Sequence, residues 1–279
     1  MRPPFPWNGA KTRLIDTLEP YIRSWGGGGR WIEPFLGSGV VTRHVRMMFP
    51  GIPMVVGDTN PWLMAAHEYW LSGKVAHPTV ADVSMVNIER FRRTTNAEFD
   101  SLSNRDKALR FLVCLYSAWG NRWQTHEDGK FLTPINTARG GSDPEFLCRR
   151  LRESHGSQTL QGEESFLTGG WVRTVSFAKP GDLVFLDSPY PETAGYSSGW
   201  DLKDWSEMYL WVRDVAVPQG IHILVCNPGT LSLLWDEVLE RREEHFTPTQ
   251  GRSTAPRVEY IGYSGPWTEP TNILSFFAK

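Results

Sequence analysis

The first 65 residues alternate between apolar runs and segments in which apolar side chains recur at helical spacing. This pattern predicts helices at about residues 12–25 and 40–48, and buried strands at 30–33 and 53–57. Asn60 followed by Pro61 predicts the N-cap and first residue of another helix. The order strand, glycine-containing loop, helix, strand is that of half a Rossmann-like unit.

From about residue 75 to 165 the pattern becomes mostly helical and polar. Helices are predicted at 104–119 and at 143–153, the second after an Asp-Pro start. The stretch 120–142 between them is glycine-rich and irregular, and 154–170 is expected to be a weakly structured linker. We therefore expect an inserted, mainly helical module.

Strand patterns return after this module and predict the second half of an α/β sheet. The apolar runs at 182–186 and 221–226 are typical of buried strands, with a helix at about 202–217 between them. Three further elements are predicted: a helix near 231–241 and strands around 258–263 and 272–277.

Composition excludes several classes of protein. The 279 residues are 40% apolar and 22% charged, which is the range of globular proteins and argues against a disordered chain, a coiled coil or a collagen-like chain. No run approaches the ~18 apolar residues of a membrane span. The opening residues contain no apolar secretion signal, which predicts a cytoplasmic chain. Three widely spaced cysteines match neither a disulfide framework nor a zinc site, and the seven histidines form no HExxH pair, so no bound metal is expected.

The middle of the chain is its basic part. Residues 86–155 hold 12 Lys and Arg against 9 Asp and Glu, which is +3, and the remainder holds 17 against 22, which is −5. Arginines cluster at 90–93 and at 149–152. Either cluster fits phosphate binding, as in nucleic-acid recognition, and either also fits a solvated helix face.

A tight glycine turn follows the first predicted strand. Residues 31–39 read WIEPFLGSG, so Gly37 and Gly39 stand between a strand and a helix. Glycine lets the backbone approach a ligand closely, and a helix N-terminus offers free N–H groups. A lone GxG is a weak signal, but Glu33 precedes it and Asp58 ends the next predicted strand, where an acid grips the hydroxyls of a nucleoside ribose.

A polar and aromatic segment, Asp187-Ser188-Pro189-Tyr190, follows the apolar strand at 182–186. The carboxyl end of a central strand is where open α/β sheets bind ligands. A planar amine could donate to Asp187 while Tyr190 stacks on its ring, as for a base extruded from a duplex. The same residues also fit an Asx-Pro turn with a core tyrosine.

Four elements, taken in this order, resemble those of the Dam-type DNA adenine N6-methyltransferases. They are W-x-G-x-K at 7–11, E-P-F-x-G-x-G at 33–39, D-x-N at 58–60, and D-P-P-Y at 187–190, where this chain has D-S-P-Y. The loop at 121–134 is also similar to one in that family's target-recognition module. The resemblance covers about residues 5–277.

The resemblance implies a Rossmann-like α/β methyltransferase domain formed by residues 1–74 and 166–279, with a helical DNA-recognition insertion at 75–165. It implies transfer of a methyl group from S-adenosylmethionine (SAM) to the N6 amino group of adenine in double-stranded DNA, with base flipping, by an enzyme of a restriction-modification system or a phage. A monomer is expected, with a weak dimer as the alternative.

The resemblance also implies roles for individual residues. The cofactor-binding residues would be Trp7, Lys11, Glu33, Phe35, Gly37, Gly39 and Asp58. The catalytic loop would be Asp187, Ser188, Pro189 and Tyr190, in which Asp187 and the Ser188 carbonyl hold the amino group and Tyr190 stacks on the base. The DNA-contacting residues would be Arg122, Lys130 and Tyr196.

Ser188 departs from the family pattern, which has proline there. Serine keeps the backbone carbonyl that accepts the target amino group, but its freer φ would loosen the loop. Two other functions remain open from the sequence. One is a catalytically silent DNA-binding relative, such as a decoy or regulatory subunit, and the other is a transferase acting on another base or carrying another donor group.

Overall fold

The structure is a computed structural model. The parts of the chain that it describes are residues 3–157, 164–189, 200–228, 235, 238–247 and 257–267.

The strands form one seven-stranded sheet, in the order β3, β2, β1, β4, β5, β7, β6. Their bounds are β1 Trp31–Glu33, β2 Met54–Asp58, β3 Glu164–Thr168, β4 Leu183–Leu186, β5 His222–Pro228, β6 Arg241–Thr247 and β7 Arg257–Ser264. The first five strands in this order are parallel, whereas β7 is antiparallel to both of its neighbours. This mixed α/β sheet is compatible with a Rossmann-like methyltransferase fold.

The strand order reverses between β1 and β4, which pair in parallel through Trp31 with Leu183 and Ile32 with Val184. From β1 the chain crosses to β2 on one side, and β4 continues to β5 on the other. In open α/β sheets, ligands bind in the crevice outside the carboxyl ends of the strands at such a switch point. Glu33 ends β1 and Asp187 follows β4 at this edge of the sheet.

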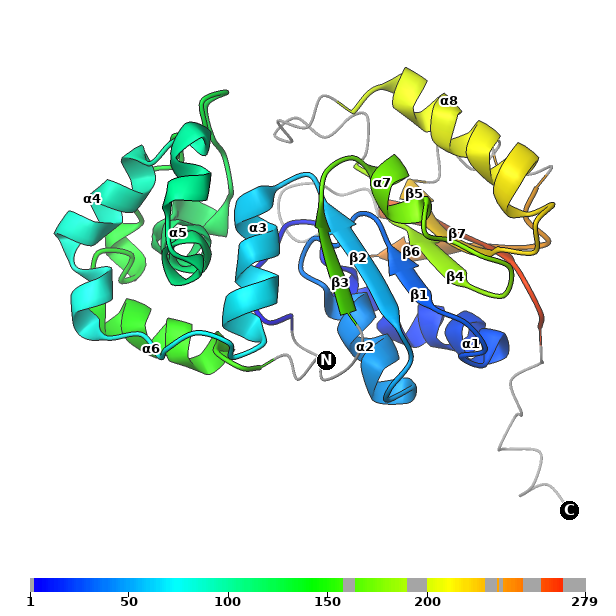
Figure 1. The fold of residues 1–279 in the computed structure, drawn as a ribbon, viewed down its shortest axis with the longest axis horizontal. Coiled ribbons are helices and arrows are strands. Elements are labelled where there is room, and N and C mark those ends of the chain that lie inside the picture. The colour runs from blue at the N-terminus through cyan, green and yellow to red at the C-terminus, as the bar shows by residue number, and fades with distance from the viewer. Residues whose placement is uncertain are drawn as a thin grey trace, which may run out of the picture.

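Helices cover both faces of the sheet (Figure 1). One face packs against α1 (Ile15–Trp25) and α2 (Val40–Met48), and the other against α7 (Trp171–Val175) and α8 (Leu202–Trp211). A short 3-10 helix, η1 (Lys11–Leu14), precedes α1, and the π-helical η7 (Val212–Ala216) continues α8. The apolar strands are buried between these two layers, which accounts for their unbroken apolar runs.

A helical lobe lies beside the sheet, next to α3 (Figure 1). Its elements are η3 (Val80–Val83), α4 (Met85–Arg93), η4 (Asn96–Ser101), α5 (Asn104–Ser117), η5 (Trp119–Asn121), η6 (Thr137–Arg139) and α6 (Pro144–Ser154). Of these, η3, α4, α5 and α6 share one hydrophobic core with α3 (Pro61–Ala65), its π-helical continuation η2 (Ala66–Leu71) and Phe5, and Phe99 of η4 packs against it. Trp62 and Trp70 are therefore core residues of the lobe, although they precede residue 75.

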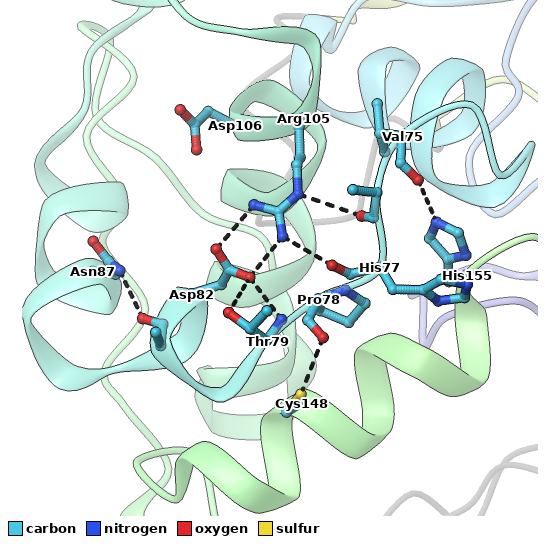
Figure 2. A network of polar contacts seen from close by, with 12 residues as sticks. Val75, His77, Pro78, Thr79, Asp82, Asn87, Arg105, Asp106, Cys148 and His155 are labelled. Carbon is cyan, nitrogen blue, oxygen red and sulfur yellow. Dashed lines mark hydrogen bonds and ion pairs between the residues drawn. The ribbon is translucent and has the colours of Figure 1, made fainter.

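Arg105 on α5 fixes the chain where it enters this lobe (Figure 2). Its guanidinium holds the Asp82 carboxylate with two bonds of 2.9 and 2.6 Å, and donates to the carbonyls of Ala76 and His77 at 3.3 and 3.1 Å. Asp82 also accepts from the backbone and hydroxyl of Thr79, at 2.7 and 2.8 Å. The Arg105 guanidinium holds the pKa of Asp82 well below its usual range. The network therefore stays ionised and in place at neutral pH.

Several sequence predictions are confirmed at residue level. The helix predicted at 40–48 is α2, and the Asn60 side chain caps α3 by accepting from the N–H groups of Trp62 at 3.1 Å and Leu63 at 3.3 Å. Asp143 caps α6 in the same way.

The cysteines Cys114, Cys148 and Cys226 are buried and free. None of the helices in the described ranges has both the length and the apolar character needed to cross a membrane.

Two predictions at the sheet edges were wrong. The expected linker at 154–170 contains β3, which pairs with β2 along all five of its residues. The helix predicted to reach residue 241 does not, because Arg241 begins the edge strand β6. Both edge strands are rich in polar residues and lack the apolar run used to recognise strands. The strand predicted around 272–277 lies outside the described residues.

Candidate active site

The loop between β1 and α2 brings the N-terminal motif onto the glycine turn. Gly37 and Gly39 both have positive φ, at 47° and 66°. A Cβ on Gly37 would lie 2.9 Å from Nε1 of Trp7, so any larger residue would collide with the indole. The buried His67 also contacts this turn, because its Nε2 lies 2.8 Å from the Gly37 carbonyl oxygen. Trp7 and Gly37, 30 positions apart, thus form one surface.

Asp58 closes the same turn from the end of β2. Its Oδ2 accepts from the Gly37 N–H at 3.1 Å, and its Oδ1 accepts from the Asn60 N–H at 3.0 Å. Burial raises the pKa of Asp58, and these backbone bonds oppose the rise. Asp58 therefore braces both the glycine turn and the start of α3.

Glu33 lies behind the turn, with 3% of its surface exposed. Its carboxyl group accepts from the indole N–H of Trp31 at 3.3 Å and from the hydroxyl of Thr42 on α2. Burial raises the pKa of Glu33 to about 8, and the charge of the nearby Asp187 adds to the rise. The residue is therefore a mostly neutral acid at pH 7.

Lys11 and Asp187 form the central ion pair of the site. Lys11 Nζ lies 2.6 Å from Asp187 Oδ1, with side-chain exposures of 8% and 16%. The pKa of Asp187 is raised to about 6. Burial is the main cause of the rise, Lys11 opposes it, and the charge of Glu259 adds to it. Lys11 also donates to the Gly9 carbonyl at 3.3 Å. The fold thus joins the first and last of the four sequence motifs through one charged contact.

Ser188, the next residue, is 2% exposed, and its hydroxyl has no hydrogen-bond partner within the described part of the chain. Pro189 ends this described segment. Tyr190, predicted to stack on the target base, and Tyr196, predicted to contact DNA, lie outside the described residues.

Sequence reasoning missed three residues near this site. Trp200 packs edge-on against Phe35, with ring centres 5.1 Å apart. Glu259 on β7 is 6% exposed, and its charge raises the pKa of Asp187. Cys226 on β5 donates to Glu259 Oε2 at 3.8 Å. Only the fold places β5 beside β4 and β7 beside β5, so no local sequence signal marks Cys226 or Glu259.

Two of the predicted DNA-contacting residues, Arg122 and Lys130, lie in the helical lobe, on the segment between α5 and η6. Isolated β-bridges join Ala118 to Ile135 and Thr125 to Phe131, so residues 118–135 fold back as a hairpin-like loop. We call this segment the 118–135 loop. Arg122 and Lys130 are both exposed on it. Lys130 Nζ lies 2.9 Å from Asp128 Oδ2.

Several side chains of the two arginine clusters form hydrogen bonds or ion pairs within the lobe. Arg92 donates to the Thr133 carbonyl at 2.7 Å, and Arg152 donates to that of Pro78 at 3.3 Å. Arg90 and Arg150 form ion pairs with Asp106 and Glu153, at 3.4 and 2.7 Å. These contacts favour a structural part for several of the clustered arginines.

Comparison with known proteins supports the family resemblance. Residues 7–122 match the family model of the D12 class N6 adenine-specific DNA methyltransferases. The chain is also similar to the DNA N-6-adenine-methyltransferase of Escherichia phage P1, with 24% identity over 243 residues, which is 81% of this chain and 29% of the relative. The chain thus spans less than a third of that relative's length. The resemblance to DNA adenine methyltransferases is confirmed.

Proposed function

We propose that this chain transfers a methyl group from SAM to the N6 amino group of an adenine that has been flipped out of double-stranded DNA. The observation that carries the proposal is the buried Lys11–Asp187 pair, 2.6 Å long, beside the glycine turn at the switch point of the sheet. The family match supports the reaction class, since it names adenine N6 methylation.

The residues around the glycine turn fit a nucleoside-type donor. Asp58 accepts from the backbone N–H groups of Gly37 and Asn60, and the lone pairs that its carboxylate does not use for the backbone would accept the ribose hydroxyls. Trp7, Phe35, Gly37 and Gly39 would then shape the walls of the donor pocket. Lys11 and Glu33 would support the pocket without lining it. The Lys11 side chain already binds Asp187, and the Glu33 side chain binds Thr42 on α2.

When bound, SAM supplies an electrophilic methyl group. The lone pair of the target amine is conjugated into the purine ring, so the amine is a weak nucleophile. Asp187 and the Ser188 carbonyl would accept its two N–H bonds, which favours a tetrahedral nitrogen and aims its lone pair at the methyl carbon. Tyr190 is proposed to stack on the ring and Tyr196 to pack beside it. The surplus proton leaves after the nitrogen has gained the methyl group, so Asp187 need not be a strong base.

We assign the DNA contacts to the helical insertion at 75–165 and the chemistry to residues 1–74 and 166–279. The positive excess of the middle segment and the exposed Arg122 and Lys130 support this division. Phosphate contacts by such residues would hold the duplex while the base is extruded toward Asp187.

The test is methyl transfer from tritiated SAM to DNA by the wild type and by Asp187→Ala. The variant should bind SAM nearly as well as the wild type, yet its transfer rate should fall by on the order of a hundredfold or more, because a preorganised contact to the reacting group is gone. Wild-type transfer by the variant would contradict the role of Asp187. A wild type that modifies no adenine on any DNA would contradict the proposed reaction.

A further inference from the structure

Arg110 on α5 is fully buried, yet it has no carboxylate partner among the described residues. Its Nη2 donates to the carbonyl of Thr94 at 2.8 Å and to that of Gly129, whereas its Nε and Nη1 have no partner in the ranges that the structure describes. Burial lowers the pKa of its guanidinium. Burying a charge with incomplete pairing is costly, and an apolar residue would fill the space more stably. The residue therefore calls for an explanation other than stability.

The contacts of Arg110 join three separate segments. Its guanidinium carbon lies 3.9 Å from the ring centre of Trp62 on α3 and 5.5 Å from that of Trp123. Trp123 and Gly129 belong to the 118–135 loop. A planar guanidinium can stack on rings and donate in its own plane at the same time, which neither lysine nor an apolar residue can do.

Other bonds fix the same stretch of backbone. The Asn96 N–H donates to the Asp128 carbonyl at 2.7 Å, while the Asn96 side chain accepts from Trp62 Nε1 at 2.9 Å. Gly129 has φ of +93°, and a Cβ there would lie 2.3 Å from the Asn96 side-chain oxygen. The loop backbone is therefore seated tightly on the lobe just before the exposed Lys130.

We propose that Arg110 is a positioning residue that holds the 118–135 loop in the shape in which Arg122 and Lys130 meet DNA. This inference rests on the proposed function, which assigns that loop to DNA. When a loop is already ordered before binding, association does not have to bear the entropic cost of ordering it. The cost of a buried, half-paired guanidinium would then be offset when DNA binds.

The variants are Arg110→Met, which removes the donors, and Arg110→Lys, which keeps the charge. Arg105→Met is the matched control, because Arg105 lies on the same helix and braces the lobe through Asp82, Ala76 and His77 (Figure 2), and its side-chain hydrogen bonds among the described residues do not include the loop. Should Arg110→Met fail to fold, Gly129→Ala unseats the loop from the other side and leaves α5 intact.

The first measurement is limited trypsin digestion of the full chain, followed at Arg122 and Lys130 relative to sites outside the loop. The second is affinity for a mixed-sequence DNA duplex at several salt concentrations, with SAM affinity measured beside it. Arg110→Met should be cut several-fold faster at the loop. It should also bind DNA on the order of tenfold more weakly, with a salt slope lower by about one unit and SAM affinity unchanged. Arg110→Lys should fall between the wild type and Arg110→Met.

Three results would overturn the inference. They are wild-type loop cleavage in Arg110→Met, an equal drop in DNA affinity in Arg105→Met, or faster loop cleavage with unchanged DNA affinity. A wild type that binds no DNA would instead contradict the proposed function, and the DNA part of the inference would fall with it. The digestion would still report whether Arg110 holds the loop, so the two failures are distinguishable.

Discussion

Replacing Lys11 by methionine separates two possible parts for this residue. The family resemblance implies that Lys11 binds the donor, whereas the structure pairs it with Asp187 at 2.6 Å in a site where the two side chains are 8% and 16% exposed. Methionine keeps most of the length of the side chain and removes the charge. Asp187 would then be a buried carboxylate without its cation.

The expected effect is an upward shift in the pKa of Asp187. Burial already raises this pKa to about 6, and Lys11 is the group that opposes the rise. A charge-assisted hydrogen bond contributes ~1.5–3 kcal/mol, which corresponds to ~1–2 pH units. Because the proposed reaction uses the ionised form of Asp187, the acid limb of the rate profile should move to higher pH by that amount.

The assay is the initial rate of methyl transfer to DNA across pH, with SAM affinity measured by calorimetry at the same pH values. Lys11→Arg, which keeps the cation, should leave the acid limb near that of the wild type. Thermal unfolding confirms that each variant is folded. An unmoved acid limb together with a large drop in SAM affinity would refute this reasoning. It would indicate instead that Lys11 binds SAM.

Three further outcomes are expected. Asp58→Ala should weaken SAM binding, by ~1.5–3 kcal/mol for each hydrogen bond to a ribose hydroxyl that the variant cannot form, and calorimetry showing wild-type affinity would place the ribose elsewhere. Arg122→Ala and Lys130→Ala should each lower the salt slope of DNA binding by about one unit, and unchanged binding at every salt concentration would show that the loop does not face DNA. Glu33→Gln should flatten the pH dependence of stability. The folded pKa of about 8 lies above the ordinary value of 4.5, so the wild type loses stability as pH rises through that window, by up to about 5 kcal/mol. The unfolding free energy of both proteins would be measured by denaturant titration at several pH values. The same change of this free energy with pH in the two proteins would contradict the burial of a neutral Glu33.

Local signals predicted the interior of the sheet and the helix starts. Asn60 and Asp143 cap their helices as their side-chain chemistry dictates, and the apolar runs of β1, β2, β4 and β5 mark strands buried on both faces. The edges were missed for a physical reason. Strand β6 carries the charged run RREEHFT, which protects an edge and resembles a solvated segment in the sequence.

The site was predictable only as a set of separate motifs. Glycine and acid positions around the turn could be identified, because the constraints on Gly37 and Asp58 arise within one βαβ unit. The Lys11–Asp187 contact could not be derived from local pattern, since 176 positions separate its partners. Arg110 was hidden for a different reason: an arginine at helical spacing usually faces solvent, and only the packing of Trp62 and Trp123 shows that this one does not.

Glu33 and Asp187, the two buried acids at the switch point, differ in charge at neutral pH. Burial raises the pKa of both, yet Glu33 rises to about 8 without a cation, whereas Lys11 holds Asp187 to about 6. At neutral pH, Glu33 is therefore mostly uncharged and Asp187 mostly ionised. A neutral Glu33 reduces the repulsion that a second carboxylate would impose on Asp187. In methyl transfer, positive charge moves from the donor sulfur to the amine nitrogen, so a carboxylate fixed at the amine stabilises the product side of that movement. In the proposed reaction, Asp187 would contribute through its fixed charge and position, and Lys11 and Glu33 would keep that charge in place.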